Sequence, residues 1–383
     1  MRLQTFATVL LIGCSPTPET GAPGGASGTA GGTATAGGAA TAGGAATAGG
    51  TGTAGGSGTA CAMTATPGVP GLPDGGCGGP FERCHPWTMD VSSVLPSCQS
   101  DAIIGALTAA GGWGTTTFRT ERSLFVLPGP ATPLRDFTPT SDFYSPDCDH
   151  VPYPVPAGGA LEGETGYACA SDGDCHLLVY DFPNRKLFEM WRANITGPST
   201  AQFRGGCAAV WDLSKQYGST LRGKGCSSAD GAGFPIAAML ATADEVFAGS
   251  IEHALRFTLP NERIRNGIYV PPGTHSTFPT SGGANTPPYS VRLRLKASFD
   301  ESTLSAPGAR VIARALKKYG MYLADGGNVP LTISSDRFTT HKWSEFGITN
   351  DNALAALRPS DFEVVDYGAP VNWKADTDCT RNP

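Results

Sequence analysis

The stretch GCSSADGAGFPIAAMLATADEVFAGSIEHALRFTL, residues 225–259, joins a polar turn to a core-forming strand and is the densest mixture of site-like and core-like residues in the chain. Its run SSADG, residues 227–231, is built from glycine and small polar residues that favour irregular turns. The end of the stretch alternates with the two-residue period of a β-strand. One face consists of Ile251, His253, Leu255, Phe257 and Leu259, and the other carries Glu252, Ala254, Arg256 and Thr258. We therefore expect a strand over 251–259 and a candidate site in the turn before it.

Similar short runs of β-branched and aromatic residues recur along the chain, separated by clusters of Gly, Pro, Asn and Asp. They predict strands over 123–127, 176–181, 186–191, 208–213, 251–259, 290–297 and 361–365. Many short strands at this spacing are typical of a β-sandwich or jelly roll. The sequence therefore predicts a mainly β fold, a β-sandwich or jelly roll with a few helices packed on it.

Two segments have helical periodicity with recognisable ends. Ser100 is a suitable N-cap for a helix over 101–110, which two glycines follow as a stop. A second helix over 305–320 begins with Ser305 as its cap, has a proline in its first turn and ends at a glycine. Its apolar stripe predicts that it packs on the sheet.

Composition limits how much of the chain can form a core. The chain has 383 residues, of which 40% are hydrophobic, but its 52 glycines and 31 prolines indicate that part of it is linker. The formal net charge of -6 excludes a broadly basic surface for nucleic acid. Beyond the N-terminus, no apolar run approaches the length of a membrane-spanning helix. We expect a mildly acidic, soluble and monomeric domain.

The N-terminus has the features of an export signal. One positive charge in Met1-Arg2 precedes a short apolar stretch, and LIGC at 11–14 is similar to the lipobox of bacterial lipoproteins. In that resemblance residues 1–13 are removed and Cys14 carries the lipid. The only link to the membrane is then this lipid anchor.

A tether follows the predicted signal. Residues 20–72 contain no Asp, Glu, Lys or Arg, and they repeat Ala-Gly-Gly and Thr-Ala. Such sequence cannot bury enough apolar area to offset its ordering entropy. We assign 14–79 to a Gly/Ala/Thr-rich tether and 80–383 to a single mainly β secreted domain.

Ten cysteines remain when Cys14 is set aside, namely Cys61, Cys77, Cys84, Cys98, Cys148, Cys169, Cys175, Cys207, Cys226 and Cys379. An even number in an exported chain predicts up to five disulfides, whose pairing the sequence leaves open. A structural zinc site is the competing interpretation, but no Cys-x-x-Cys pair supports it. We expect neither a metal nor a cofactor.

A series of distinctive motifs runs from residue 80 to 366, namely HPWTMDVSS, DAIIGAL, VPYPVPAGGALEGE, DGDCHLLVYD, KLFEMWRA, GCAAVWDLS, SSADGAGFPI, DEVFAGSIEHALRFT, VRLRLKASFD, ALKKYGMYLADGG and SDFEVVD. In these motifs, their order and their spacing, the chain resembles a family of secreted bacterial proteins for which no activity is established. The resemblance implies secretion and a single domain, and it assigns no catalytic residues. This chain has Ala237-Ala238-Met239 where the family pattern has Pro-Gly, and Gly231 replaces an alanine.

Carboxylates beside turns are the candidates for acid-base chemistry. Glu162, Asp174 and Asp230 are candidate catalytic residues, and Asp325 is a candidate for substrate binding. Glycoside hydrolysis needs two carboxyl groups across a cleft, one kept protonated and one ionised. The rival interpretation is that each Asp beside a Gly only satisfies a turn backbone.

Two histidines join this set. His253 is a candidate catalytic base, and His176, which follows Asp174 closely, is a candidate for substrate binding. The structural interpretation of His253 is a core imidazole bonded to a carbonyl or carboxylate. A metal site formed by His176, His253 and His275 is a further alternative, although no His-x-His pair supports it.

A basic face is the third pattern. Alternation over 290–297 puts Arg292, Arg294 and Lys296 on one side of a strand. Such a face is either solvated or, if concave, a groove for an anionic polymer such as a uronic-acid polysaccharide. Arg256 and Lys296 are therefore candidate substrate-binding residues.

Compartment, architecture and acid-rich turns favour an exported, lipid-anchored protein at the outer membrane or cell surface that cleaves glycosidic bonds in an extracellular polysaccharide. In hydrolysis, Asp230 and Glu162 are the acid and base. In elimination, His253 is the base and Arg256 or Lys296 neutralises a uronate.

The alternative is a non-catalytic carbohydrate-binding or adhesion module. Its stacking platforms are Trp87, Trp113, Trp191 and Trp343. No catalytic-serine motif, phosphate-binding loop or dinucleotide fingerprint is present.

Overall fold

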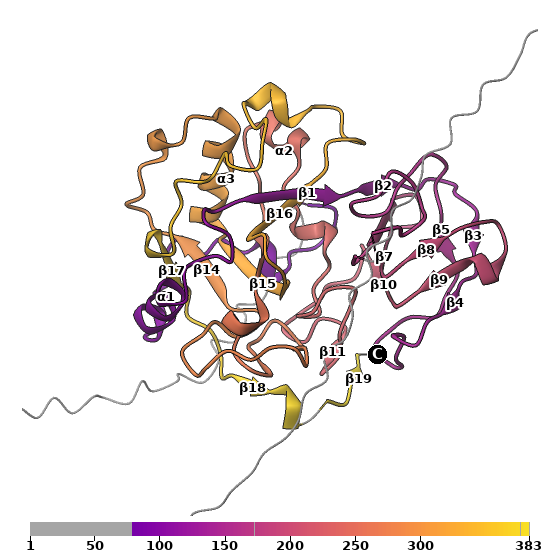
Figure 1. Ribbon diagram of the computed structural model, residues 1–383, viewed down its shortest axis with the longest axis horizontal. Coiled ribbons are helices and arrows are strands. Elements are labelled where there is room, and N and C mark those ends of the chain that lie inside the picture. Colours follow the sequence, from indigo (N-terminus) through magenta and orange to yellow (C-terminus); the bar gives the residue numbers. More distant parts are fainter. Residues whose placement is uncertain (1–78, 172, 376, 383) are drawn as a thin grey trace, which may run out of the picture. The chain divides into compact units, whose positions relative to one another are not determined.

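The computed structural model describes residues 79–171, 173–375 and 377–382, and the structural statements below concern these residues (Figure 1). The predicted signal at 1–13, Cys14 and nearly all of the predicted tether lie outside them. No helix in the described ranges is long and apolar enough to cross a membrane.

A six-stranded mixed sheet lies at the centre of the fold, with strand order β1-β16-β12-β15-β14-β17. Its strands are β1 (Thr120–Leu124), β12 (Leu255–Leu259), β14 (Arg292–Leu295), β15 (Met321–Gly326), β16 (Leu331–Ser334) and β17 (Phe362–Val364). β12 pairs in parallel with β15 and antiparallel with β16, and all five of its residues are buried. Its leucines and Phe257 enter the main core, whereas Arg256 and Thr258 alternate to the other face and are held by hydrogen bonds.

Three α-helices accompany this sheet, and Figure 1 shows α3 beside β14 and α1 beside β17. They are α1 (Ser100–Ala109), α2 (Ala243–Ala248) and α3 (Pro307–Lys318). α3 has a proline in its first turn, as predicted, and buries its apolar stripe. Gly320 follows α3 with φ +67°, and a Cβ there would lie 2.4 Å from the Leu293 carbonyl oxygen, so this turn requires glycine.

A four-stranded sheet has the order β10-β7-β6-β2, with β2 (Val126–Pro128), β6 (Leu177–Asp181), β7 (Lys186–Trp191) and β10 (Cys207–Asp212). Its residues alternate between two apolar clusters. Leu178, Leu187 and Trp211 belong to the main core, whereas Leu177 and Phe188 belong to a second cluster on the opposite side. Because both faces are covered, these strands are apolar almost throughout.

Shorter elements complete the described chain. The remaining strands are β3 (Leu134–Arg135), β4 (Thr138–Pro139), β5 (Tyr153–Pro154), β8 (Asn194–Ile195), β9 (Phe203–Gly205), β11 (Gly223–Lys224), β13 (Ile268–Tyr269), β18 (Val371–Asn372) and β19 (Thr380–Arg381). The 3-10 turns are Pro86–Thr88, Thr200–Gln202, Ala237–Met239, Asn261–Arg263, Glu301–Thr303, Trp343–Phe346, Pro359–Asp361 and Trp373–Ala375.

Three disulfides in which both cysteines lie in the described ranges confirm the prediction that cysteines are paired. They are Cys148–Cys207, Cys169–Cys175 and Cys226–Cys379. The last pair joins residues 153 positions apart and ties the C-terminal segment to the turn that contains Asp230. This link places β19 against β11, at the base of the polar turn.

The mainly β fold with a few helices is confirmed. Its strand pairing differs from the antiparallel ladders of sandwiches and jelly rolls, because β1–β16, β2–β6, β4–β9 and β12–β15 are parallel pairs. The strand predicted over 186–191 has the bounds of β7, whereas the strand predicted over 251–259 begins only at Leu255. His253 therefore lies in the bend before β12 and not on its apolar face.

Candidate functional site

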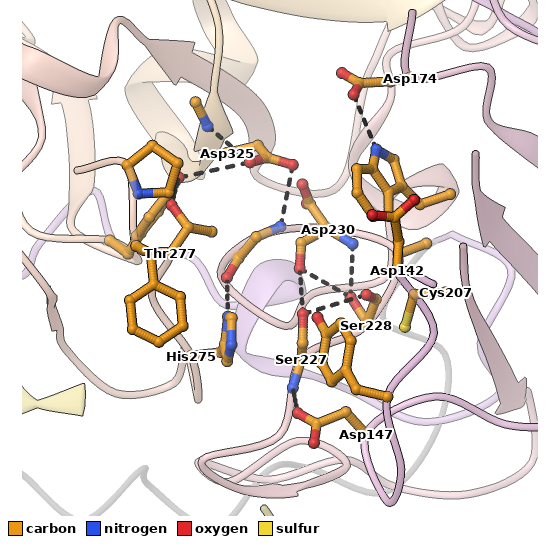
Figure 2. A pocket seen from close by; sticks show the side chains of 18 of the residues that line it. Asp142, Asp147, Asp174, Cys207, Ser227, Ser228, Asp230, His275, Thr277 and Asp325 are labelled. Carbon is orange, nitrogen blue, oxygen red and sulfur yellow. Dashed lines mark hydrogen bonds between the residues drawn. The ribbon is translucent and has the colours of Figure 1, made fainter. Parts of the chain in front are cut away.

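A cavity of about 620 Å³ opens where the turn 227–231 meets the carboxyl end of β15. Figure 2 shows Asp325, Asp230 and Asp174 around it, with Ser227 and Ser228 in the turn. Its acidic lining residues are Asp142, Asp147, Asp174, Asp230 and Asp325. Its aromatic lining residues are Tyr144, Trp191, Phe278, Tyr289 and Trp373. Carboxyl groups and aromatic rings in one concave surface are the composition of a ligand site.

The polar turn is held by its own small side chains. The Ser228 hydroxyl accepts the backbone N–H of Asp230 at 3.0 Å and donates to the Phe234 carbonyl at 2.6 Å. The backbone N–H of Ser227 donates to Oδ1 of Asp147 at 2.8 Å. Short serine side chains thus satisfy a buried, irregular backbone and orient Asp230 toward β12.

Asp230 forms a buried two-point ion pair with Arg256, which lies in the middle of β12. The arginine Nε lies 3.2 Å from both carboxylate oxygens, and its Nη2 lies 2.8 Å from Oδ1. A further hydrogen bond, from Nη1 to the Thr332 hydroxyl at 2.8 Å, fixes the guanidinium to β16. Although burial disfavours the charged guanidinium, Asp230 raises the pKa of Arg256. The hydrogen-bond donors of Arg256 are therefore used by Asp230 and Thr332. The residue holds Asp230 in place, instead of binding a substrate as the sequence predicted.

Asp325, one of the predicted site residues, has a carboxyl group that reaches the cavity and whose pKa suits it to proton transfer. Its side chain is 25% exposed, and it accepts backbone N–H groups from Gly231 at 3.1 Å and Gly326 at 2.7 Å. Burial, followed by the nearby charge of Asp230, raises the pKa of Asp325 to about 7. A Cβ at position 231 would lie 2.5 Å from Oδ1 of Asp325, so the glycine at this position lets the carboxyl group approach the turn.

Glu162 and His176 form a second buried pair next to Asp230. The imidazole Nδ1 lies 2.6 Å from a Glu162 oxygen, and Nε2 donates to the carbonyl of Ala229 at 3.0 Å. Burial opposes charge on the imidazole, but the Glu162 carboxylate outweighs it and raises the pKa of His176 to about 9. The pair supports the backbone that carries Asp230, and neither residue lines the cavity.

Asp174 lies in the cavity lining as an exposed carboxylate. Its Oδ1 accepts the indole N–H of Trp191 at 2.9 Å, the bond drawn as a dashed line from the labelled Asp174 in Figure 2. The negative charge of Asp174 is among the influences that raise the pKa of Asp325. Of the predicted site residues, the structure thus brings Asp174, Asp230 and Asp325 to one cavity, with Arg256, Glu162 and His176 directly behind it.

His253 lies elsewhere. It lines a second cavity of about 460 Å³, where its Nε2 contacts Glu245 at 3.0 Å and its Nδ1 contacts the carbonyl of Ala254 at 2.9 Å. Asp230 is not in that lining, and His253 is not in the lining of the first cavity. The structural interpretation, a core imidazole bonded to a carboxylate and a carbonyl, describes His253 better than a shared catalytic role.

The basic face predicted over 290–297 is not a groove. Arg292 and Arg294 are each 6% exposed. Arg292 donates to the carbonyls of Tyr319, Pro86 and Met89, while Arg294 pairs with Glu363 and donates to two further carbonyls. Lys296 donates to the carbonyl of Ser360 at 2.8 Å. These basic side chains donate hydrogen bonds to backbone carbonyls of neighbouring segments and so stabilise those segments, rather than lining a surface open to solvent.

The three-histidine metal site does not assemble in the described part of the chain. Nδ1–H of His275 donates to the carbonyl of Gly231 at 2.8 Å, and burial lowers the pKa of His275 to about 4. His176 and His253 are held by separate carboxylates, as described above. Within the described ranges, the residues that come close enough together to hold a metal ion are Glu164, Cys169 and Cys175. The two cysteines form a disulfide with each other.

Several lining residues were not anticipated from the sequence. Asp147, Tyr289 and Trp373 come from loops without a distinctive motif, so no local signal identified them. Of the four tryptophans considered as stacking platforms, Trp191 lines the cavity. Trp87, Trp113 and Trp343 are at most 2% exposed and belong to the core.

None of the family models, curated proteins or solved structures compared with the chain matches it. The predicted resemblance to secreted bacterial proteins stays a prediction. The residues that line the cavity are therefore the basis for inferring a function. They combine a carboxyl group with a raised pKa, an exposed carboxylate and aromatic rings, which is a set that can donate a proton and bind a polyhydroxylated ligand.

Proposed function

We propose that the protein is an exported glycoside hydrolase whose site is the cavity between the turn 227–231 and β15. The observation that carries the proposal is Asp325, a carboxyl group open to the cavity whose pKa is raised to about 7. A carboxylic acid that keeps its proton near neutral pH is suited to protonate a glycosidic oxygen as the bond to the anomeric carbon breaks. This replaces Asp230 with Asp325 as the proton donor.

Asp174 supplies the second carboxylate that glycoside hydrolysis requires. It lies in the same lining, accepts a hydrogen bond from Trp191 and forms no ion pair within the described residues. A carboxylate there stabilises the positive charge that develops on the sugar ring and accepts the proton of the attacking water. Asp230, with its charge held by Arg256, keeps the proton on Asp325 by repulsion.

The aromatic residues of the cavity match a sugar ligand. Phe278 is 69% exposed, and Trp373 lies beside it with ring centroids 4.8 Å apart. Exposed rings offer flat apolar surfaces for the C–H faces of sugar rings, while carboxylates accept hydrogen bonds from hydroxyl groups. This lining would also serve a non-catalytic module, so activity has to be measured.

Release of reducing ends from a panel of soluble polysaccharides tests the proposal. Asp325→Asn and Asp174→Asn should each lower the rate by at least about 100-fold, the usual scale for losing a positioned acid or base. Asp366→Asn is the matched control, because Asp366 is exposed and is not in the cavity lining. Binding of a polysaccharide without any cleavage would assign the protein to the carbohydrate-binding class instead.

We also propose that the mature protein is held at the outer membrane or cell surface by a lipid on Cys14, which lies outside the described residues. The three disulfides are compatible with an extracytoplasmic compartment. Metabolic labelling with a fatty acid should mark the wild type and not Cys14→Ala. Equal labelling of the two proteins would contradict the anchor.

A further inference from the structure

The lining of the main cavity is rich in hydrogen-bond acceptors and poor in positive charge. It contains five aspartates, and no lysine or arginine is among the described lining residues. The one histidine of the lining, His275, uses Nδ1 to donate to the carbonyl of Gly231, and burial keeps it uncharged at neutral pH by lowering its pKa. Electrostatic complementarity therefore favours a ligand that brings donors and positive charge.

The negative charge is only partly compensated within the protein. Arg256 is paired with Asp230 and lies 3.6 Å from Asp325, and Asp142 lies 3.3 Å from Arg192. Asp147 and Asp174 form no ion pair within the described residues. Oδ1 of Asp147 accepts the Ser227 backbone N–H, which fixes the carboxyl group at the cavity wall. Burial raises the pKa of Asp147, and the nearby charges of Arg222 and Arg381 oppose this shift without forming an ion pair with Asp147 within the described residues.

A buried donor in the same lining independently points to a ligand. Trp373 is 5% exposed, and its indole N–H has no hydrogen-bond partner among the residues that the structure describes. An unpaired buried N–H costs free energy, which an acceptor on a bound molecule would recover. Sugar hydroxyl groups are such acceptors, and the neighbouring Phe278 ring is exposed for contact with a sugar face.

On these grounds, and resting on the proposed glycoside hydrolase function, we propose that the substrate is a glycan of amino sugars with free ammonium groups, one of which is held by Asp147. The ammonium group supplies three donors and a positive charge to the carboxylate. Trp373 donates to a hydroxyl group of the same or the adjoining sugar. A uronic-acid polymer would instead place carboxylates against the aspartates, and like charges in one cavity repel.

Calorimetric titration of the full-length Asp325→Asn protein tests the assignment, because this variant binds without cleaving. The ligands are glucosamine, glucose and glucuronate oligosaccharides matched in linkage and length. We expect the glucosamine oligosaccharide to bind at least about 10-fold more tightly than the glucose one, and the glucuronate one to bind most weakly. The preference should shrink when salt is raised from 20 to 500 mM, because salt screens charge pairs at an open site.

A second substitution isolates the ammonium contact. Asp147→Asn, made in the same background, keeps an oxygen for the Ser227 N–H and should reduce the preference for glucosamine over glucose to less than about 2-fold. Binding of the glucose oligosaccharide should stay within about 2-fold of the parent. Asp366→Asn should leave both values unchanged.

The outcomes separate this inference from the function on which it rests. Cleavage of neutral or uronic polysaccharides by the wild type, with equal or weaker binding of the glucosamine oligosaccharide, would overturn the amino-sugar assignment and leave the hydrolase standing. An unchanged preference in Asp147→Asn would overturn the assigned contact. Absence of both binding and cleavage with every saccharide would overturn the hydrolase itself.

Discussion

The guanidinium of Arg256 and the carboxylate of Asp230 meet in a pair whose side chains are 6% and 0% exposed. The arginine comes from the centre of the main sheet, and the aspartate comes from the turn that lines the cavity. Asp325 lies next to this pair, with Oδ2 3.6 Å from the arginine Nη2. The pair therefore links the rigid sheet to the proposed proton donor, and its loss affects both stability and charge at the site.

Removing one partner of this pair should destabilise the protein strongly. Asp230→Asn or Arg256→Met leaves an uncompensated buried charge or an unpaired carboxylate, which costs about 3–5 kcal/mol. The double variant should lose less than the sum of the two single losses, because neither charge is then left alone. Urea unfolding of the three variants measures this. Additive losses would show that the two residues do not act as a pair.

Activity should depend on the proton of Asp325. Because the pKa of Asp325 is raised to about 7, the rate should fall as pH rises through about 7. Asp325→Glu should retain part of the activity with a displaced alkaline limb, whereas Asp325→Asn should show no such limb at all. A wild-type rate that stays constant from pH 6 to 8.5 would exclude Asp325 as the acid.

The same carboxyl group should make stability fall with rising pH. In the unfolded chain Asp325 ionises near its ordinary value of 3.8, whereas the folded protein keeps the proton until about pH 7. The unfolded state therefore binds fewer protons across this window, and stability is lost as pH rises from about 4 to 7. In thermal melts, the melting temperature of Asp325→Asn should rise relative to that of the wild type as the pH is raised from 4 to 8. A constant difference in melting temperature would contradict the raised pKa.

The Glu162–His176 pair should have its own pH signature. The pKa of His176 is raised from 6.5 to about 9, so the stability gained from the charged imidazole is complete below about pH 6.5 and is lost as pH rises through about 9. The wild type should thus exceed His176→Gln most at pH 6 and least at pH 9.5 in urea unfolding. His150→Gln is the control, since His150 lies outside this pair and the cavity lining.

Glu189 provides a test of the core behind the site. It is fully buried and accepts N–H groups from Ile236 at 3.1 Å, Ala237 at 2.8 Å and the Trp211 indole at 3.1 Å. In Glu189→Gln the amide NH₂ faces at least one of these donors, so unfolding free energy should drop by about 1–3 kcal/mol. The exposed Glu252→Gln should change stability little. Equal unfolding midpoints for the two variants would show that these bonds contribute nothing.

The second and third disulfides offer a comparison of loop lengths. Cys226–Cys379 spans 153 positions and Cys169–Cys175 spans 6. Replacing both cysteines of the longer bridge by serine should cost about 3–5 kcal/mol, and the same change in the shorter bridge should cost less, because a longer loop gains more entropy when it is released. Denaturant unfolding under non-reducing conditions provides the measurement. A larger loss from the shorter bridge would contradict this ranking.

Local sequence patterns identified the elements that are specified by their own residues. α3 was predictable because its proline, apolar stripe and terminal glycine all lie within one segment, and β7 was predictable from its short run of apolar and aromatic residues. β15 and β16 were missed, although they flank β12 in the main sheet. β16 has only four residues, and the glycines and Asp325 in YGMYLADGG, residues 319–327, favour a turn where the six-residue β15 forms.

The sequence by itself determined a mainly β chain with two of its helices, paired cysteines and a polar turn at 227–231, since each depends on composition or on spacing within a few residues. The tertiary structure alone decided which polar residues share a site. Asp174, Asp230 and Asp325 come from segments far apart in the chain, and their convergence depends on how the strands pair and where Cys226–Cys379 closes. It also decided that Arg292 and Arg294 are buried, because a strand's alternation shows which side chains share a face but not what covers that face.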